Sequence, residues 1–201
     1  FQIVRVLPNS PAHVAGLCPF FDFITEVDGI PLNDDGGIAF LKKYIADNIN
    51  KTLRLTVFNL RVRTTRQTEL LPCDGWGGVG LFGCVLEWNT ADNAMESSWH
   101  VVDLVEGSPA DRCGDIMAQR DYLLGMEASD RSLVLFGPHS TSSDLRDMVT
   151  SSLSHGDDVL VLLVFDSVNN AIKEVSIPMC GINTMGIDVA DGYLHFIPAV
   201  V

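Results

Sequence analysis

The stretch GWGGVGLFGCVLEW, residues 75–88, decides the expected fold and function of this chain. Five of its residues are glycines, and they precede a short apolar run that is typical of a strand. Glycine adopts positive φ without strain and lets a ligand approach the backbone closely. Successive N–H groups in such a loop can converge on an anion, such as the terminal carboxylate of a peptide. The strand that follows could pair through its open edge with an extended peptide.

A glycine-rich stretch also fits two other structures. An ordinary β-turn has the same composition. A phosphate-binding loop is the second alternative, but the chain has no GKS or GKT sequence here and no lysine-bearing helix follows. The order of the predicted elements around the loop is therefore needed to distinguish a turn from a binding loop.

Outward from this loop, the chain repeats one order of features. The matched segments are 10–12 with 108–110 (both Ser-Pro-Ala), 15–16 with 113–114, 22–30 with 121–129, Phe58 with Phe165, and 69–72 with 175–178. Two copies of one fold explain this order. The polar segment 89–98 interrupts the apolar pattern, so we expect one domain at 1–92 and a second at 93–201.

Each copy is expected to contain the same elements. Ser-Pro-Ala starts a short helix, because Ser caps a helix and Pro fits its first turn, and Gly16 and Gly114 can end these helices. The expected strands are 22–27, 52–58, 65–71 and 82–88 in the first copy, and 121–126, 158–165, 171–177 and 186–189 in the second. Amphipathic helices are expected at 37–48 and at 142–153, the latter with a capping box. The predicted fold is α+β, with two tandem small β-barrels or sandwiches that each carry two helices.

Several motifs resemble a known family. GLFG at 80–83 resembles the carboxylate-binding GLGF loop of PDZ domains, and NSPAHVAGL at 9–17 resembles their small helix. Because the GLGF-like loop comes last, each copy resembles a circularly permuted PDZ domain. The doubled arrangement is similar to the Golgi reassembly and stacking protein (GRASP) family. The motifs that carry this resemblance are NSPAHVAGL, CPFFDFI, GWGGVGLFGC, SSWHVVDL and GYLHFIP.

The resemblance implies a peptide-binding groove in the first copy. Its residues would be Gly80, Leu81, Phe82, Gly83, Cys84 and Val85, with Ile38, Leu41 and Ile45 on the helix opposite. A second groove would lie at Met185, Gly186 and Ile187, but its loop lacks the tryptophan of the family, which argues against a second carboxylate site. The resemblance also implies a self-association tail, made of Tyr193, Leu194, His195, Phe196 and Ile197.

The family resemblance further implies partners and a location. The expected ligands are C-terminal tails of golgin-like coiled-coil proteins and of membrane cargo, and the chain would also self-associate in trans to tether membranes at the cytoplasmic face of the Golgi. The family anchors itself by N-terminal myristoylation, and because the chain begins at Phe1 we expect that segment to lie outside this sequence. A zinc site shared with a golgin would use His13 and a cysteine after Trp88, but Asn89 stands there, so no metal site and no cofactor are expected.

Composition excludes several classes of function. The net charge of −13 disfavours binding to nucleic acid or to anionic lipid through charge alone. The longest apolar run, 159–165, is far too short to span a bilayer. The five cysteines have long spacings and no CxxC, which indicates reduced thiols rather than a disulfide scaffold or zinc module.

Three alternatives to a tethering module remain. An enzyme is not expected, because GxSxG and HExxH are absent and Ser108 is explained as a helix cap. A PDZ pair that senses substrate for a protease would share the permuted order. A scaffold with filled grooves would bury Trp76, Trp88, Trp99 and Phe82. We expect Leu81→Asp or Gly83→Asp to abolish peptide capture and to leave the fold intact.

Overall fold

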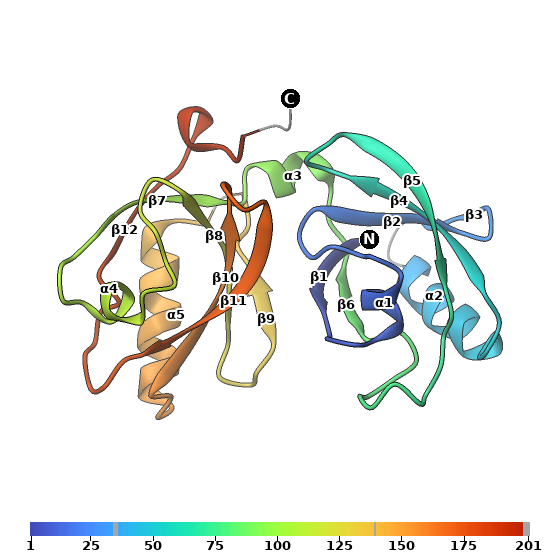
Figure 1. Ribbon diagram of the computed structural model, residues 1–201, viewed down its shortest axis with the longest axis horizontal. Helices are drawn as coiled ribbons and strands as arrows, with labels where there is room; N and C mark the ends of the chain where they lie inside the picture. The colour runs from blue at the N-terminus through green and yellow to red at the C-terminus, as the bar shows by residue number, and fades with distance from the viewer. Residues whose placement is uncertain (34–35, 139, 199–201) are drawn as a thin grey trace. The chain divides into compact units, whose positions relative to one another are not determined.

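The computed structural model describes residues 1–33, 36–138 and 140–198. It divides into two compact units, Phe1–Ala91 and Asp92–Pro198, and Figure 1 shows that each contains a bent sheet with one long helix beside it. All strand pairs are antiparallel. The predicted α+β fold in two copies is therefore confirmed.

The two units contain the same elements in the same order. The first unit has β1 (Gln2–Val6), α1 (Pro11–Val14), β2 (Asp22–Val27), β3 (Ile30–Pro31), α2 (Gly36–Asp47), β4 (Leu53–Asn59), β5 (Thr64–Leu70) and β6 (Cys84–Glu87). After α3 (Ala91–Met95), the second has β7 (Trp99–Leu104), α4 (Pro109–Cys113), β8 (Asp121–Glu127), β9 (Leu133–Leu135), α5 (Ser142–Ser154), β10 (Val159–Asp166), β11 (Ala171–Pro178) and β12 (Ile187–Ala190). A short 3-10 helix, η1 (Tyr193–His195), follows β12.

The strand order explains why the copies look permuted. The first sheet runs β5-β4-β2-β1-β6 and the second β11-β10-β8-β7-β12, with β3 and β9 attached to β2 and β8. The last strand of each copy returns to pair with its first strand. It therefore lies at the edge of the sheet, where one side of its backbone is left without a neighbouring strand among the described residues.

The local signals in the sequence act as expected. Ser10 Oγ accepts a hydrogen bond from His13 N at 3.2 Å, and Ser108 Oγ accepts one from Asp111 N at 3.3 Å, so both hydroxyls cap short helices that begin with proline. Gly114 ends α4 with φ of 72°. The predicted capping box at the start of α5 is present.

Each unit has its own apolar core beneath its longer helix. Leu41 and Ile45 of α2 pack onto strands of the first sheet, and Leu145 and Val149 of α5 pack onto the second. Phe82 belongs to the first of these clusters and is 9% exposed. These clusters fix each long helix beside its own sheet.

The tryptophans are not all core residues, so that part of the filled-groove interpretation was wrong. Trp99 is buried and stacks on Phe136 at 4.2 Å between ring centroids. Trp88 is 46% exposed and contacts the ring of Phe1 edge-on, and Trp76 is half-buried above the glycine loop. Trp88 is exposed because it follows the last residue of β6, Glu87, which pairs with Gln2 at the start of β1.

A buried aspartate ties each sheet together at equivalent positions. Asp22 accepts the backbone N–H of Cys18 and pairs with Arg66 at 2.6 Å. Asp121 accepts the N–H of Met117 and pairs with Lys173 at 3.3 Å. Removing one member of such a pair leaves a buried charge without compensation, which is costly.

The pairing of Asp166 with Arg120 predicts a pH dependence of stability. Hydrogen bonds from Arg120, and then from the backbone N–H groups of Asn169 and Val168, lower the pKa of Asp166. An aspartate in the unfolded chain titrates near pKa ~3.9. The stabilisation is therefore complete above that pH and is lost as the pH falls toward the depressed folded value.

We expect Asp166→Asn to reduce the difference between the urea midpoints measured at pH 7 and pH 3. The matched control is Asp147→Asn, which changes an exposed carboxylate on α5. An equal pH dependence in the Asp166→Asn variant and the unaltered chain would contradict this prediction.

Candidate functional site

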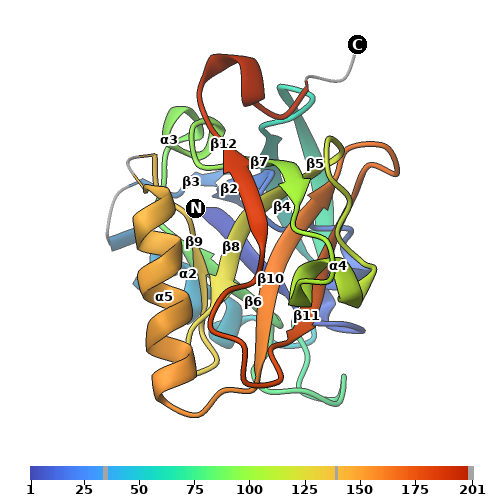
Figure 2. The ribbon, with the colours of Figure 1, turned by 90° about the vertical axis from the view of Figure 1, so that its left-hand side faces the viewer.

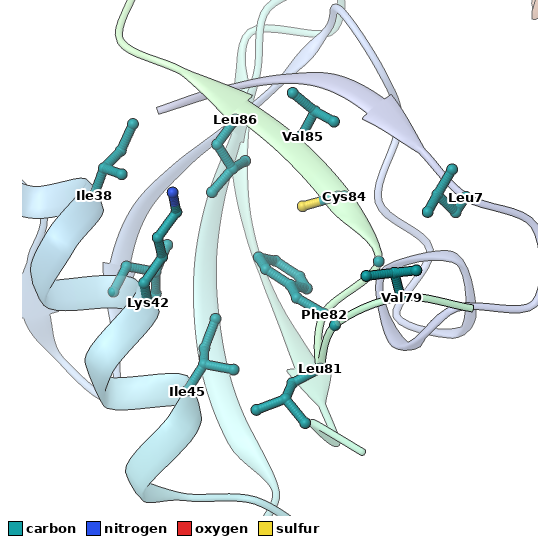
Figure 3. A pocket seen from close by; sticks show the side chains of 13 residues that line it. Leu7, Ile38, Lys42, Ile45, Val79, Leu81, Phe82, Cys84, Val85 and Leu86 are labelled. Atoms are coloured by element: carbon teal, nitrogen blue, oxygen red, sulfur yellow. The ribbon is translucent and has the colours of Figure 1, made fainter. Parts of the chain in front are cut away.

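A cavity of about 490 Å³ lies between α2 and β6 of the first unit. Figure 3 shows side chains of the helix facing the strand, with Phe82 at the bottom of the space between them. The lining residues are Leu7, Ile38, Leu41, Lys42, Ile45, Val79, Gly80, Leu81, Phe82, Gly83, Cys84, Val85 and Leu86. All nine residues predicted for the first groove are among them. The role of these residues in peptide binding stays a prediction.

In residues 80–83 the backbone carbonyls are hydrogen-bonded, whereas the backbone N–H groups have no partner among the described residues. Its four carbonyl groups all accept hydrogen bonds from the same unit, from Trp76 Nε1 (2.8 Å), Cys73 N (3.2 Å), Ala12 N (2.9 Å) and Leu7 N (2.9 Å) in that order. None of the four N–H groups donates to another group within the described part of the chain. Because the four carbonyls are bonded within the unit, the four N–H groups can donate hydrogen bonds to an acceptor atom of a ligand.

Gly83 is required for this arrangement. Its φ is +71°, and a Cβ at this position would lie 2.2 Å from the Cβ of Ser10, the cap of α1. The expectation that Gly83→Asp leaves the fold intact is therefore wrong, because any side chain here separates the loop from α1. Leu81, which is half-buried at the mouth of the groove, is the better site for a test.

The comparison with protein families gives a direct result. A model of the GRASP55/65 PDZ-like domain matches residues 1–86 and residues 55–200. The chain belongs to this family. The prediction of tandem PDZ-like copies is thereby confirmed.

Individual relatives agree with the family. Golgi reassembly-stacking protein 1 of Homo sapiens is 33% identical over 202 residues, which cover 98% of this chain and 42% of that protein, and the Mus musculus protein gives the same values. An uncharacterized protein of Schizosaccharomyces pombe is 26% identical over 203 residues, covering 99% of this chain and 53% of that protein. The GRASP-family chain described here thus spans less than half the length of its mammalian relatives.

The strand edge of the first groove is formed by β6. Cys84 and Leu86 are half-buried and line the cavity, whereas Val85, between them, is exposed. Burial raises the pKa of the Cys84 thiol to about 12, so this thiol stays protonated at neutral pH. It is an apolar wall of the groove and not an activated nucleophile.

Four lining residues were missed by the sequence analysis, namely Leu7, Lys42, Val79 and Leu86. Lys42 could have been found, because it follows Ile38 by four residues on an amphipathic helix and must share its face. Leu7 could not, since it reaches the groove only through the bond from its N–H to the carbonyl of Gly83.

The second unit of this GRASP-family chain has an equivalent cavity of about 420 Å³ between α5 and β12. Met185, Gly186 and Ile187, the residues predicted for a second groove, all line it. The carbonyls of Met185 and Gly186 accept from Ala110 N at 3.0 Å and Val105 N at 2.9 Å. These bonds repeat those of Phe82 and Gly83, so the two loops are anchored in the same way.

The predicted self-association tail follows β12. Leu194 is 89% exposed, whereas His195, Phe196 and Ile197 are half-buried. The Nδ1 of His195 lies 3.1 Å from the Nδ1 of His100 on β7, and this contact holds the tail on the second unit. The side chain of Tyr193 lies outside what the structure describes.

Two kinds of site are absent from the described ranges 1–33, 36–138 and 140–198. No cluster of three or more His, Cys, Asp or Glu side chains could hold a metal ion there. No helix in those ranges has the length and apolar character needed to cross a membrane. His13, the histidine considered above for a shared zinc site, uses its Nδ1 to accept a hydrogen bond from Asn9 N at 2.9 Å.

The crowding at Gly83 predicts a stability difference between two glycines of the loop. Gly80 has φ of +81° but nothing within 4 Å of a Cβ, whereas a Cβ at Gly83 meets Ser10. We expect Gly80→Ala to cost about 1 kcal/mol of unfolding free energy from backbone strain alone, and Gly83→Ala to cost about 2 kcal/mol or more. Urea unfolding of both variants measures the difference, and equal costs would contradict the prediction.

Proposed function

We propose that the first groove of this GRASP-family chain binds the C-terminal tail of a partner protein as an added strand on β6. The tail's carboxylate would accept hydrogen bonds from the N–H groups of residues 80–83. Its backbone would pair with the open edge of β6, and its last apolar side chain would enter the space between Leu41, Ile45 and Phe82. The hydrogen bonding of the loop carries this proposal, because its four carbonyls are bonded and its four N–H groups have no partner within the described residues.

The proposal extends to partners and location through the relatives. Golgi reassembly-stacking protein 1 is named for the Golgi. We propose that the chain is a non-catalytic interaction module on the cytoplasmic face of the Golgi, where its ligands are tails of golgin-like coiled-coil proteins and of membrane cargo. The same relatives favour this role over that of a protease regulator, since neither name refers to proteolysis.

Fluorescence anisotropy with paired peptides tests the binding proposal. Each peptide ends in an apolar residue, and it is compared as the free acid and as the C-terminal amide. We expect the free acid to bind with a Kd in the micromolar range, about −8 kcal/mol, and the amide to bind at least ~10-fold more weakly because it removes the charge that the loop N–H groups receive. Equal binding of acid and amide would overturn the carboxylate site.

Self-association in trans is the second part of the proposal. The tail of one copy would dock on another copy, and Leu194, which is 89% exposed, offers a large apolar side chain for this contact. We expect Leu194→Asp to reduce the clustering of beads coated with the chain, because the charge cannot enter an apolar contact. Val168→Asp, which changes a 72% exposed valine in the turn after β10, is the matched control. Equal clustering of the two variants would contradict a role for the tail.

A further inference from the structure

The two grooves are built alike but differ in the groups that a ligand would meet. Leu145, Val149 and Arg146 of α5 occupy the places that Leu41, Ile45 and Lys42 occupy on α2. Figure 2 shows β12 and α5 side by side, and residues of β6 and α2 line the corresponding cavity of the first unit. Because the long helix carries the same kinds of side chain in both copies, the differences lie in the loop and in the edge strand.

The loop of the second groove is less able to receive a carboxylate. Gly186 N donates to Thr184 Oγ1 at 3.3 Å, whereas the equivalent N–H of Gly83 has no partner within the described residues. Asn183 and Thr184 stand where Gly80 and Leu81 stand in the first loop. One of the converging donors is thus already used by a side chain of the loop itself.

The edge of the second groove carries two unneutralised negative charges. Asp188 of β12 lies directly opposite Asp103 of β7 in the strand register. Both side chains are exposed, and neither forms an ion pair within the described part of the chain. Like charges at directly opposite positions repel one another across a strand pair. The equivalent register pair in the first copy is Arg5 with Val85, so this repulsion belongs to the second copy alone.

The second copy as a whole also carries more net negative charge than the first. Residues 93–201 contain 5 basic and 16 acidic residues, a net charge of −11, whereas residues 1–92 contain 8 basic and 10 acidic residues, a net charge of −2. An acidic field attracts cations and repels a peptide's terminal carboxylate. The second copy therefore favours a ligand of opposite charge to the one that suits the first loop.

We infer that the second groove binds an internal, extended segment of a partner protein that carries a lysine or arginine opposite Asp188. This inference rests on the proposed function in that both grooves are taken to hold an added strand. The segment would pair with the free edge of β12. Its inward side chains would be apolar and would contact Leu145 and Val149, and its outward basic side chain would neutralise Asp188 and Asp103. Because this mode of binding does not use a terminal carboxylate, the inferred segment lies within the partner's sequence and not at its end.

The test uses acetylated and amidated nonapeptides with the whole chain. In the first peptide, valine and leucine alternate with lysine; in the second, glutamate replaces each lysine; the third groups the same lysines at one end. We expect the alternating lysine peptide to bind at least ~10-fold more tightly than either of the others. Asp188→Lys should weaken its binding by at least ~10-fold, and Asp147→Lys, the same charge change on an exposed part of α5, should leave it within about twofold.

Several results would overturn the inference. They are tighter binding of the glutamate peptide, equal binding of the grouped lysine peptide, and equal effects of the two charge reversals. If Asp188→Lys fails to fold, Asp188→Asn replaces it, and unchanged binding in that variant counts against the inference. The apolar free-acid peptide is measured on the same proteins. Its failure to bind would reject the carboxylate site of the first groove and leave the result for the lysine peptide standing.

Discussion

Leu81→Asp is expected to weaken the binding of a carboxylate-terminated peptide by about 100-fold or more. The new carboxylate would stand at the mouth of the groove, beside the N–H groups that we propose as donors to the ligand's own carboxylate, and like charges placed together cost several kcal/mol. Leu81 is half-buried at the edge of the first core, and its carbonyl accepts a hydrogen bond from Cys73 N. Fluorescence anisotropy with the free-acid peptide measures the loss.

The second copy supplies a matched control. Thr184 is the counterpart of Leu81, so Thr184→Asp adds the same charge to the other loop. It should leave the binding of the free-acid peptide within about twofold, because this charge belongs to a different groove. Circular dichroism verifies that both variants fold. Folded Leu81→Asp protein with unchanged affinity would reject the first groove as the site.

Phe165→Ala is expected to lower the free energy of unfolding by about 3–5 kcal/mol. Phe165 lies on β10, is 1% exposed and contacts the ring of Tyr122 on the neighbouring β8. Truncation to alanine removes this apolar contact and leaves a cavity at a position that is almost completely buried. Urea unfolding followed by tryptophan fluorescence measures the loss.

A position close by in sequence gives the comparison for this change. Val168 is 72% exposed in the turn after the same strand, so Val168→Ala should change the free energy of unfolding by less than about 0.5 kcal/mol. A loss below about 1 kcal/mol in the Phe165→Ala variant would mean that the site collapses around the missing ring. The assignment of Phe165 as a core residue would then be wrong.

The repeat and its elements could be predicted because their signals are local. Ser-Pro-Ala, the glycine after each short helix and the periodicity of α2 and α5 all act within a few residues of the chain. The strand of residues 82–88 was predicted longer than β6, since only residues 84–87 pair with β1. The glycine loop alone was compatible with a turn, and its position in the repeat was the deciding signal.

The rest depends on contacts between residues far apart in sequence. Gly83 must be glycine because of Ser10, and Leu7 lines the groove because its N–H reaches the loop. The register that places Asp188 opposite Asp103 lies next to a bulge in the β7–β12 pair, between Asp188 and Val189. Neither periodicity nor composition fixes such a register. The exposure of Trp88 likewise depends on where β6 ends.

The position of β6 as the last strand of its unit has a mechanical consequence. The chain leaves the end of this strand directly, past Trp88, whose ring rests on Phe1, and Asn89, whose amide donates to Gln2 Oε1 at 2.8 Å. A pull on this exit in the direction of the strand would act along β6 and not across it. The hydrogen bonds to β1 on one side, and to an added ligand strand on the other, would then be loaded together in shear. Paired strands that are loaded in shear separate only when many hydrogen bonds break at once. A strand pulled perpendicular to its axis would instead lose its hydrogen bonds one at a time.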